Sequence, residues 1–362
     1  MTPRTRRLHE LGQSLWLDSI SRDLLRSGRL ARCIGELSIT GLTSNPTIFE
    51  QAFAGGDYDD SIHSLHAAGV SGEALFFELA LQDLTQAADL LRPAFDASGG
   101  LDGWVSLEVS PLLADNTAHT IAAAAALHRR LDRPNVLIKI PGTPEGLRAV
   151  QEVIVDGVPV NVTLLFTREH YLAAAEAWLR GLERRLEAGL DVQVASVASM
   201  FVSRWDQAVK PLVPPALQHR LGVAMAMRSY QAHHELLASP RWRRLAKAGA
   251  RPQRLLWAST GSKDAATPDT FYVQALAAPG TIDTLPEKTL QAWADHGALG
   301  APMLTDGGDA EAVRAAMRHA SVDVDAVGHR LQRDGVEAFA LSWHSMLARI
   351  AEKCAAAGQG GT

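Results

Sequence analysis

Lys139 is the residue of this sequence with the clearest potential for chemistry. It lies within the apolar run 136–141, where a buried charge is costly unless it is paired or neutralised. Lysine, unlike arginine, can lose its proton and attack a carbonyl carbon. Burial favours that neutral amine, so Lys139 is interpreted either as a Schiff-base nucleophile or as a strand-end lysine that reaches solvent.

Polar side chains also interrupt the neighbouring apolar runs. Glu108 lies in the run 104–109, which precedes the run of Lys139. On an adjacent strand its carboxylate could handle the proton transfers of imine formation, although a structural ion pair is the alternative. Asn161 and Thr163 are two residues apart, so they share one face of a strand and give it a polar inner surface.

Two further polar residues end apolar runs. Asp18 ends the run 14–18, and Asn45 comes directly before Pro46. A helix cap or a turn is the common alternative role for both. Five apolar runs therefore carry polar side chains suited to carbonyl chemistry, and their convergence favours a reaction site.

These polar residues can form one site only if the strands and helices of the fold bring them together. Strand-like apolar runs alternate with amphipathic, Ala- and Leu-rich stretches such as 117–131 and 168–186, which predicts parallel βαβ units. Eight strands predict an α/β fold of the (β/α)8 TIM-barrel type, which places reacting groups at the carboxyl ends of its strands. A doubly wound sheet is the alternative, and the lack of a Gly-x-Gly-x-x-Gly turn after the first strand weakens it. The predicted strands are 14–18, 41–45, 104–109, 136–141, 158–166, 192–196, 254–259 and 281–285.

We expect one barrel domain over residues 1–354. The long interval between the second and third predicted strands indicates additional helices within about residues 46–103. Residues 355–362 are rich in Ala and Gly and predict a flexible C-terminal tail.

Composition narrows the function classes. The formal net charge of -5 favours neither nucleic acid nor an anionic membrane as a partner. Two cysteines, no secretory signal after the basic residues 1–7 and no apolar run of about 18 residues predict a cytoplasmic protein. His233 and His234 are adjacent and cannot share a helix face, so we expect no metal site there.

The chain resembles the transaldolase family of class I aldolases, in particular its longer bacterial form, over residues 8–350. This resemblance implies a (β/α)8 barrel that needs no cofactor. It implies transfer of a dihydroxyacetone unit from sedoheptulose 7-phosphate to glyceraldehyde 3-phosphate. The products would be erythrose 4-phosphate and fructose 6-phosphate, in the non-oxidative pentose phosphate pathway. The similar segments are 41–49, 105–109, 138–141, 161–166, 257–260 and 285–290.

The resemblance also implies roles for the reacting groups. Lys139 matches the lysine that forms the Schiff base. Asp18 matches the acid/base that acts on the C4 hydroxyl of the substrate. Glu108 matches the carboxylate that, with Thr163, holds the water of imine formation and hydrolysis.

The remaining matched residues bind the substrate. Asn45 and Asn161 match residues that hydrogen-bond the ketol unit, and Ser199 and Arg204 match the phosphate-binding segment. Short-form transaldolases carry a second phosphate-binding arginine after strand seven, whereas this chain has Lys263 there. Lys263 is interpreted either as the replacement phosphate ligand or as a solvated loop lysine.

Two other functions stay open. Small aldolases of the superfamily carry a tyrosine where this chain has Glu108, which favours transfer over aldol cleavage. An enzyme like fructose-6-phosphate aldolase is still one alternative, and a non-catalytic sugar-phosphate-binding protein is the other. The sequence leaves a monomer and a homodimer equally possible.

Overall fold

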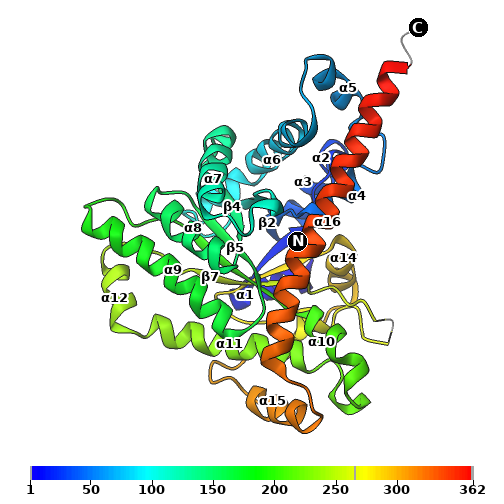
Figure 1. The fold of residues 1–362 in the computed structure, drawn as a ribbon. Helices are drawn as coiled ribbons and strands as arrows, with labels where there is room; N and C mark the ends of the chain where they lie inside the picture. Colours follow the sequence, from blue (N-terminus) through cyan, green and yellow to red (C-terminus); the bar gives the residue numbers. More distant parts are fainter. Residues whose placement is uncertain (1, 265, 360–362) are drawn as a thin grey trace.

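The computed structural model describes residues 2–264 and 266–359, and its eight strands close into a parallel barrel (Figure 1). Each strand pairs with the next in sequence order, and β8 pairs with β1. The TIM-barrel prediction is therefore confirmed, and the doubly wound alternative is wrong. The strands are β1 (Ser14–Asp18), β2 (Ile39–Thr43), β3 (Trp104–Glu108), β4 (Val136–Pro141), β5 (Val160–Leu165), β6 (Ser196–Phe201), β7 (Arg254–Ala258) and β8 (Ile282–Leu285).

Helices surround the barrel and connect its strands. None of those that the structure describes is long and apolar enough to cross a membrane. The α-helices are α1 (Pro3–Leu11), α2 (Arg22–Arg26), α3 (Arg29–Leu37), α4 (Pro46–Ala52), α5 (Asp59–Ala67), α6 (Gly72–Ala97), α7 (Thr117–Leu131), α8 (Pro144–Val155), α9 (Arg168–Glu187), α10 (Ser203–Val209), α11 (Leu221–Leu237), α12 (Pro240–Lys247), α13 (Phe271–Ala275), α14 (Glu287–His296), α15 (Ala310–His319) and α16 (Val324–Gln359). Short 3-10 helices are η1 (Pro111–Leu113), η2 (Lys210–Leu212) and η3 (Pro215–Leu217).

Two predicted boundaries need correction. The sixth strand is Ser196–Phe201 and not 192–196. Val192 and Val194 are buried in the core, so their apolar alternation reflects the packing of a connecting segment that has no place in the barrel ladder. Helix α16 continues to Gln359, so residues 355–359 of the predicted tail are helical. Residues 360–362 lie outside the described residues, and the single-domain interpretation stays a prediction.

Strand residues alternate between the barrel interior and the layer under the helices. At the amino end of the barrel the inward side chains include the apolar Trp16, Trp104 and Leu137, with Ser14 and Arg254 at the rim. Trp16 occupies the space beside Gly41 on β2, where an added Cβ would lie 2.4 Å from the indole ring. At the carboxyl end the inward positions are mainly polar. The same alternation therefore gives the barrel interior a largely apolar layer at the amino end and a polar surface at the carboxyl end.

The C-terminal helix α16 crosses the carboxyl end of the barrel and runs on to α4 and α5 (Figure 1). Gln332 of α16 donates hydrogen bonds of 3.0 Å each to the carbonyls of Gly142 and Leu164. The pairing of β5 with β6 shifts register at this point, and Leu164 has a φ of +59°. The side chain of Gln332 therefore satisfies carbonyl groups at the irregular end of the strand and fixes α16 over the barrel.

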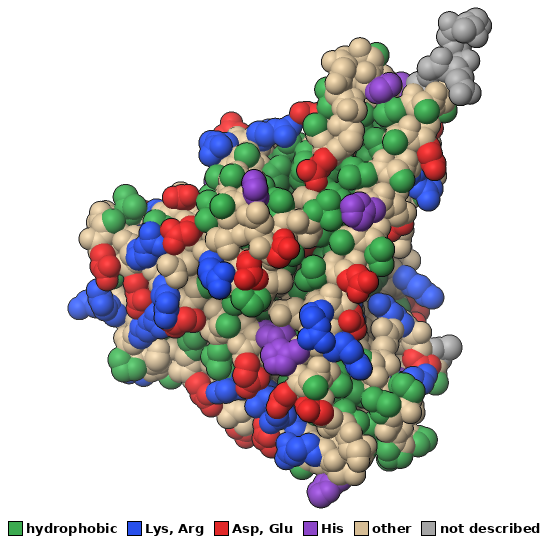
Figure 2. Space-filling model, in the orientation of Figure 1, with side chains coloured by type: hydrophobic (Ala, Val, Ile, Leu, Met, Phe, Trp, Pro, Cys, Tyr) green, Lys and Arg blue, Asp and Glu red, His purple; other side chains and the backbone are tan. Residues whose placement is uncertain are grey.

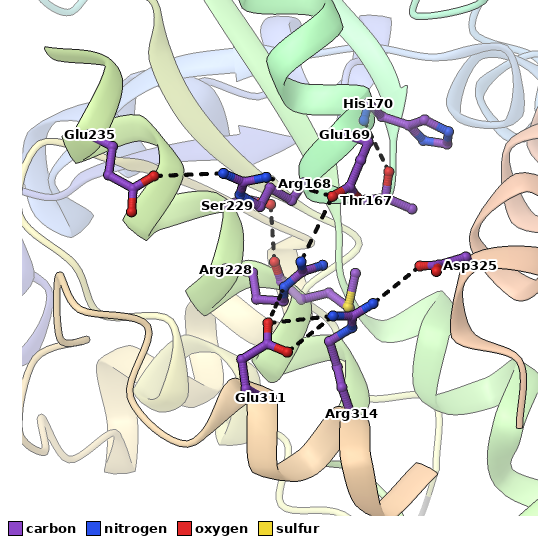
Figure 3. Close-up of polar contacts among 11 residues, drawn as sticks. Thr167, Arg168, Glu169, His170, Arg228, Ser229, Glu235, Glu311, Arg314 and Asp325 are labelled. Atoms are coloured by element: carbon purple, nitrogen blue, oxygen red, sulfur yellow. Dashed lines mark hydrogen bonds and ion pairs between the residues drawn. The ribbon is translucent and has the colours of Figure 1, made fainter. Parts of the chain in front are cut away.

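A network of charged side chains links α15 to the barrel helix α11 and α16 to α15 (Figure 3). Arg228 of α11 lies 2.7 Å from Glu311 of α15, and Arg314 of α15 lies 3.3 Å from Asp325 of α16. Burial raises the pKa of Glu311, but the two arginines outweigh burial and lower it. Cationic and anionic side chains intermix over this part of the surface (Figure 2). The α15–α16 segment is thus docked by paired charges.

We expect the substitution Asp283→Asn to stabilise the protein. Asp283 of β8 is fully buried, and neither carboxylate oxygen has a hydrogen-bond partner among the described residues. Burial raises the pKa of Asp283 well above its ordinary value, so the folded protein keeps the proton; the nearby Thr260 hydroxyl acts in the opposite direction but donates its hydrogen bond to the carbonyl of Thr284. The unfolding free energy of the wild type therefore falls as pH rises from about 4 toward that raised pKa. An amide cannot ionise, and the gain should reach about 1–3 kcal/mol at neutral pH or above.

Chemical denaturation at several pH values measures this gain. The difference between Asp283→Asn and wild type should grow with pH and vanish near pH 4. A constant difference would show that folding does not raise the pKa of Asp283. Asp102→Asn is the matched control, because Asp102 is buried but lies 3.2 Å from the guanidinium of Arg254. That variant should destabilise the protein, because it leaves a buried cation unpaired.

Candidate active site

A cavity of about 380 Å³ opens at the carboxyl end of the barrel. Every strand except β3 contributes a described residue to its wall, and Phe339 of α16 contributes from above. Glu108 and Asn161 do not line it but contact residues that do. The structure therefore brings the predicted site together at one place. The predicted residues in the wall are Asp18, Asn45, Lys139, Thr163, Ser199, Arg204 and Lys263.

Lys139 lies at the base of this cavity and is buried, with 6% of its side chain exposed. Its Nζ donates a hydrogen bond of 2.8 Å to the carbonyl of Ser44 and lies 3.5 Å from Oε2 of Glu108. The strand-end lysine that reaches solvent is therefore not what the structure contains. A buried amine held by one carbonyl and one carboxylate can act as a nucleophile once it is neutral.

Glu108 is placed by the barrel register, which pairs it with Lys139 on the next strand. Neither carboxylate oxygen has a hydrogen bond to another described residue, and the same is true of the buried Thr163 hydroxyl. Burial raises the pKa of Glu108, the charge of Lys139 lowers it and the carboxylate of Asp18 raises it, with an upward net direction. Glu108 is thus a carboxyl group that can hold or release a proton beside the amine.

Asp18 lies at the end of β1 and lines the same cavity. Thr43 of β2 donates a hydrogen bond of 2.8 Å to its Oδ1, since the two residues are register partners. Burial raises the pKa of Asp18 above its ordinary value, although Lys139 and the Thr43 hydrogen bond act in the opposite direction. A carboxylate with a raised pKa is a stronger base than an exposed aspartate.

The amide of Asn161 is fixed by two serines. Ser199 donates a hydrogen bond of 2.6 Å to Oδ1 of Asn161, and Nδ2 of Asn161 donates one of 3.2 Å to Ser106. Ser199 therefore orients Asn161, although its side chain also lines the cavity. This serine was expected only as part of a phosphate-binding segment.

Asn45 caps a helix, which is the alternative role predicted for it from the sequence. Its Oδ1 accepts a hydrogen bond of 3.0 Å from the backbone N–H of Ile48 and caps α4, where Pro46 is the first helical residue. The helix cap is therefore real. Because Asn45 also lines the cavity, its amide nitrogen can donate to a ligand while the oxygen serves the helix.

Two cations, Arg204 and Lys263, line the outer part of the cavity. Arg204 is the second residue of α10, which follows shortly after β6, and Lys263 follows β7. Burial lowers the pKa of Arg204, and burial together with the positive charge of Arg204 lowers that of Lys263. An anion bound between them would relieve both unfavourable effects, as a phosphate group would.

Several residues of the site were not singled out from the sequence. The Ser44 carbonyl could not be, because every residue carries one. Thr43 and Ser106 lie two residues before Asn45 and Glu108 on strands already identified, so the period of two could have indicated them. Phe339 comes from α16 and carries no sequence signal at all.

Comparison with known proteins identifies the family to which this chain is similar. Residues 15–350 match the family described as "Transaldolase/Fructose-6-phosphate aldolase". A protein named "Transaldolase" from Frankia alni is 45% identical, with 98% of each chain covered. One of the same name from Thermobifida fusca is 46% identical over 96% of this chain and 98% of that protein. "Transaldolase 1" from Streptomyces avermitilis is 43% identical over 95% of this chain and 94% of that protein.

Proposed function

Since the chain belongs to the transaldolase/fructose-6-phosphate aldolase family, we propose that it is a transaldolase that works through a Schiff base on Lys139. The observation that carries this proposal is the buried Nζ of Lys139, 3.5 Å from Glu108 and in one cavity with Asp18. The reaction moves a dihydroxyacetone unit from sedoheptulose 7-phosphate to glyceraldehyde 3-phosphate. It yields erythrose 4-phosphate and fructose 6-phosphate in the non-oxidative pentose phosphate pathway.

Imine formation is the first stage. Neutral Lys139 attacks C2 of the ketose phosphate, and the resulting carbinolamine loses water to give the imine. Glu108 suits the proton transfers of this stage, because it lies beside Nζ and its pKa is raised by burial. The free hydroxyl of Thr163 and the carboxylate of Glu108 can hold the water molecule that leaves and later returns.

Carbon–carbon cleavage follows. Asp18 removes the proton of the C4 hydroxyl, the C4 oxygen becomes the carbonyl of the departing aldose phosphate, and the electrons of the C3–C4 bond pass into the imine. An enamine of dihydroxyacetone stays attached to Lys139. The raised pKa of Asp18 makes it a better base for this step.

Substrate binding falls to the remaining wall residues. The amide of Asn45 hydrogen-bonds the ketol hydroxyls from the wall. Asn161 lies behind the wall, where Ser199 and Ser106 hold its amide, and its contact with the ketol unit requires the substrate to replace one of these serine partners. Arg204 and Lys263 bind the phosphate at the outer end. The acceptor aldehyde then reacts with the enamine, the proton and bond steps run in reverse, and water releases the product from Lys139.

Borohydride trapping tests this proposal. Reduction in the presence of fructose 6-phosphate should add a dihydroxyacetone-sized group, and peptide mapping should place it on Lys139. An adduct on another residue, or none, would contradict the mechanism. Two alternatives give different outcomes: an aldolase would release free dihydroxyacetone from fructose 6-phosphate without an acceptor. A non-catalytic binder would bind sugar phosphate with neither adduct nor turnover.

The remaining predictions concern the cell and the assembly. We propose a cytoplasmic location, in keeping with sugar-phosphate substrates. A monomer and a homodimer are both compatible with a cavity whose described wall comes from one chain. Light scattering on the purified protein decides between the two states.

A further inference from the structure

The guanidinium of Arg204 lies against two phenyl rings. Its Cζ is 5.1 Å from the ring centre of Phe201 at the end of β6 and 5.9 Å from the ring centre of Phe339 in α16. Both rings are nearly fully buried, and both line the cavity of the site. These distances are within the range of cation–π attraction.

Arg204 is partly buried and lacks the polar contacts that orient the fully buried arginines of this protein. Within residues 2–264 and 266–359 it forms no ion pair and its side chain makes no hydrogen bond. Buried arginines elsewhere in the chain differ, since Arg254 donates to Asp102, Ser14 and three backbone carbonyls. The two rings therefore provide the contacts that can set the plane of the Arg204 guanidinium.

The geometry of α16 brings Phe339 to this position. Gln332, Gly335 and Phe339 follow one another at spacings of three and four, so they lie on one face of the helix. Gln332 fixes this face to the barrel through two carbonyls. Gly335 has no side chain to keep the helix away: an added Cβ would lie 2.9 Å from Leu164 and 3.4 Å from Nη1 of Arg204.

We propose that Phe339 is a positioning residue for phosphate recognition, acting through Arg204. This inference rests on the proposed role of Arg204 as a phosphate ligand. Phe339 and Phe201 contact the guanidinium through their ring faces and occupy none of its N–H groups, which stay free for phosphate oxygens. Planar guanidinium groups bind phosphate best through two parallel N–H bonds, which requires a fixed plane. Selectivity for phosphorylated substrates thus depends on a residue of the C-terminal helix.

The acceptor half-reaction tests the proposal. In a ping-pong mechanism, kcat/KM for the acceptor reports only the steps that follow release of the first product. We expect Phe339→Leu, which keeps apolar bulk but removes the ring, to lower kcat/KM for glyceraldehyde 3-phosphate about 10-fold. The value for unphosphorylated glyceraldehyde should change less than about twofold, because this acceptor does not use Arg204.

Three further variants make the result specific. Phe339→Tyr keeps the ring and should restore kcat/KM for the phosphorylated acceptor. Leu341→Ala is the matched control on the same helix, because Leu341 is 64% exposed, and it should leave both values unchanged. In an Arg204→Gln background, Phe339→Leu should have no further effect on the phosphorylated acceptor. An equal fall for both acceptors, or the same fall in the Arg204→Gln background, overturns the proposal.

A binding measurement separates this inference from the proposed function. Titration calorimetry with inorganic phosphate needs no turnover, and we expect Phe339→Leu to weaken phosphate binding about 10-fold. If borohydride trapping fails on wild type but this weakening occurs, the Schiff-base function is wrong and the role of Phe339 stands. If trapping labels Lys139 and phosphate binds equally to both proteins, the role of Phe339 is wrong.

Discussion

Replacement of Lys139 by methionine is expected to reduce turnover by at least about 10⁴-fold and to abolish the borohydride adduct. Methionine has a similar length and fills the same buried space, so the cavity should keep its shape. It cannot form an imine, and the other two lysines of the described cavity wall, Lys263 and Lys288, lie beyond the carboxyl ends of β7 and β8. Coupled assays with fructose 6-phosphate and erythrose 4-phosphate measure the rate, and intact mass measures the adduct.

The matched control is Lys263→Met, which removes the other lysine predicted for the site. This variant should lose affinity for sugar phosphates yet still give the dihydroxyacetone adduct at high substrate concentration. Thermal unfolding must show that Lys139→Met is folded, because Glu108 loses its neighbouring cation. An adduct or more than about 1% of the wild-type rate in Lys139→Met would falsify the assignment of the nucleophile.

Asp18→Asn is expected to lower kcat by about 10²–10⁴-fold, the usual contribution of a general base. Asparagine has the same size and can still accept the hydrogen bond from Thr43. Imine formation should proceed, but the C4 hydroxyl proton would have no base to receive it. Borohydride should therefore trap an adduct with the mass of the whole fructose 6-phosphate, instead of the dihydroxyacetone fragment.

The pH profile provides an independent check on Asp18. Burial raises its pKa, and the reaction requires the deprotonated form. The wild-type rate should rise with pH through that raised pKa, and this limb should be absent from the residual rate of Asp18→Asn. Asp23→Asn is a control on the following helix, since Asp23 is exposed and pairs with Arg29. A dihydroxyacetone-sized adduct in Asp18→Asn would assign proton removal to another group.

The carboxyl-end positions of the site could be predicted because polar side chains stand out in apolar strands. Lys139, Glu108 and Asn161 were identified in this way, and the register places all three on adjacent strands. The sixth strand was misplaced because its inward positions include Ser199, which breaks the apolar pattern, whereas the connecting segment before it alternates like a strand. An alternating apolar pattern indicates that a segment is buried, but it does not show that the segment forms hydrogen bonds with neighbouring strands.

Contacts that depend on tertiary structure could not be predicted. The hydrogen bond from Lys139 joins residues 95 positions apart and ends on a carbonyl, which no side chain marks. Phe339 reaches Arg204 only because Gly335 and Gln332 let α16 lie against the barrel, and each of these residues is unremarkable by itself. Apolar periods of two and 3.6 residues identify single strands and helices. The contacts of Lys139 and Phe339 depend instead on how these elements pack against one another.

Helix α16 gives the site a dependence on the order of synthesis. The nucleophile, its carboxylates and both asparagines lie within residues 18–161, whereas Gln332 and Phe339 follow all eight strands in the sequence. A nascent chain can therefore close its barrel before this helix docks, since folding often begins while synthesis continues. The reactive amine of Lys139 would then be in place before Phe339 can orient Arg204. Only a chain in which α16 has docked would distinguish phosphorylated sugars from other carbonyl compounds in the cell.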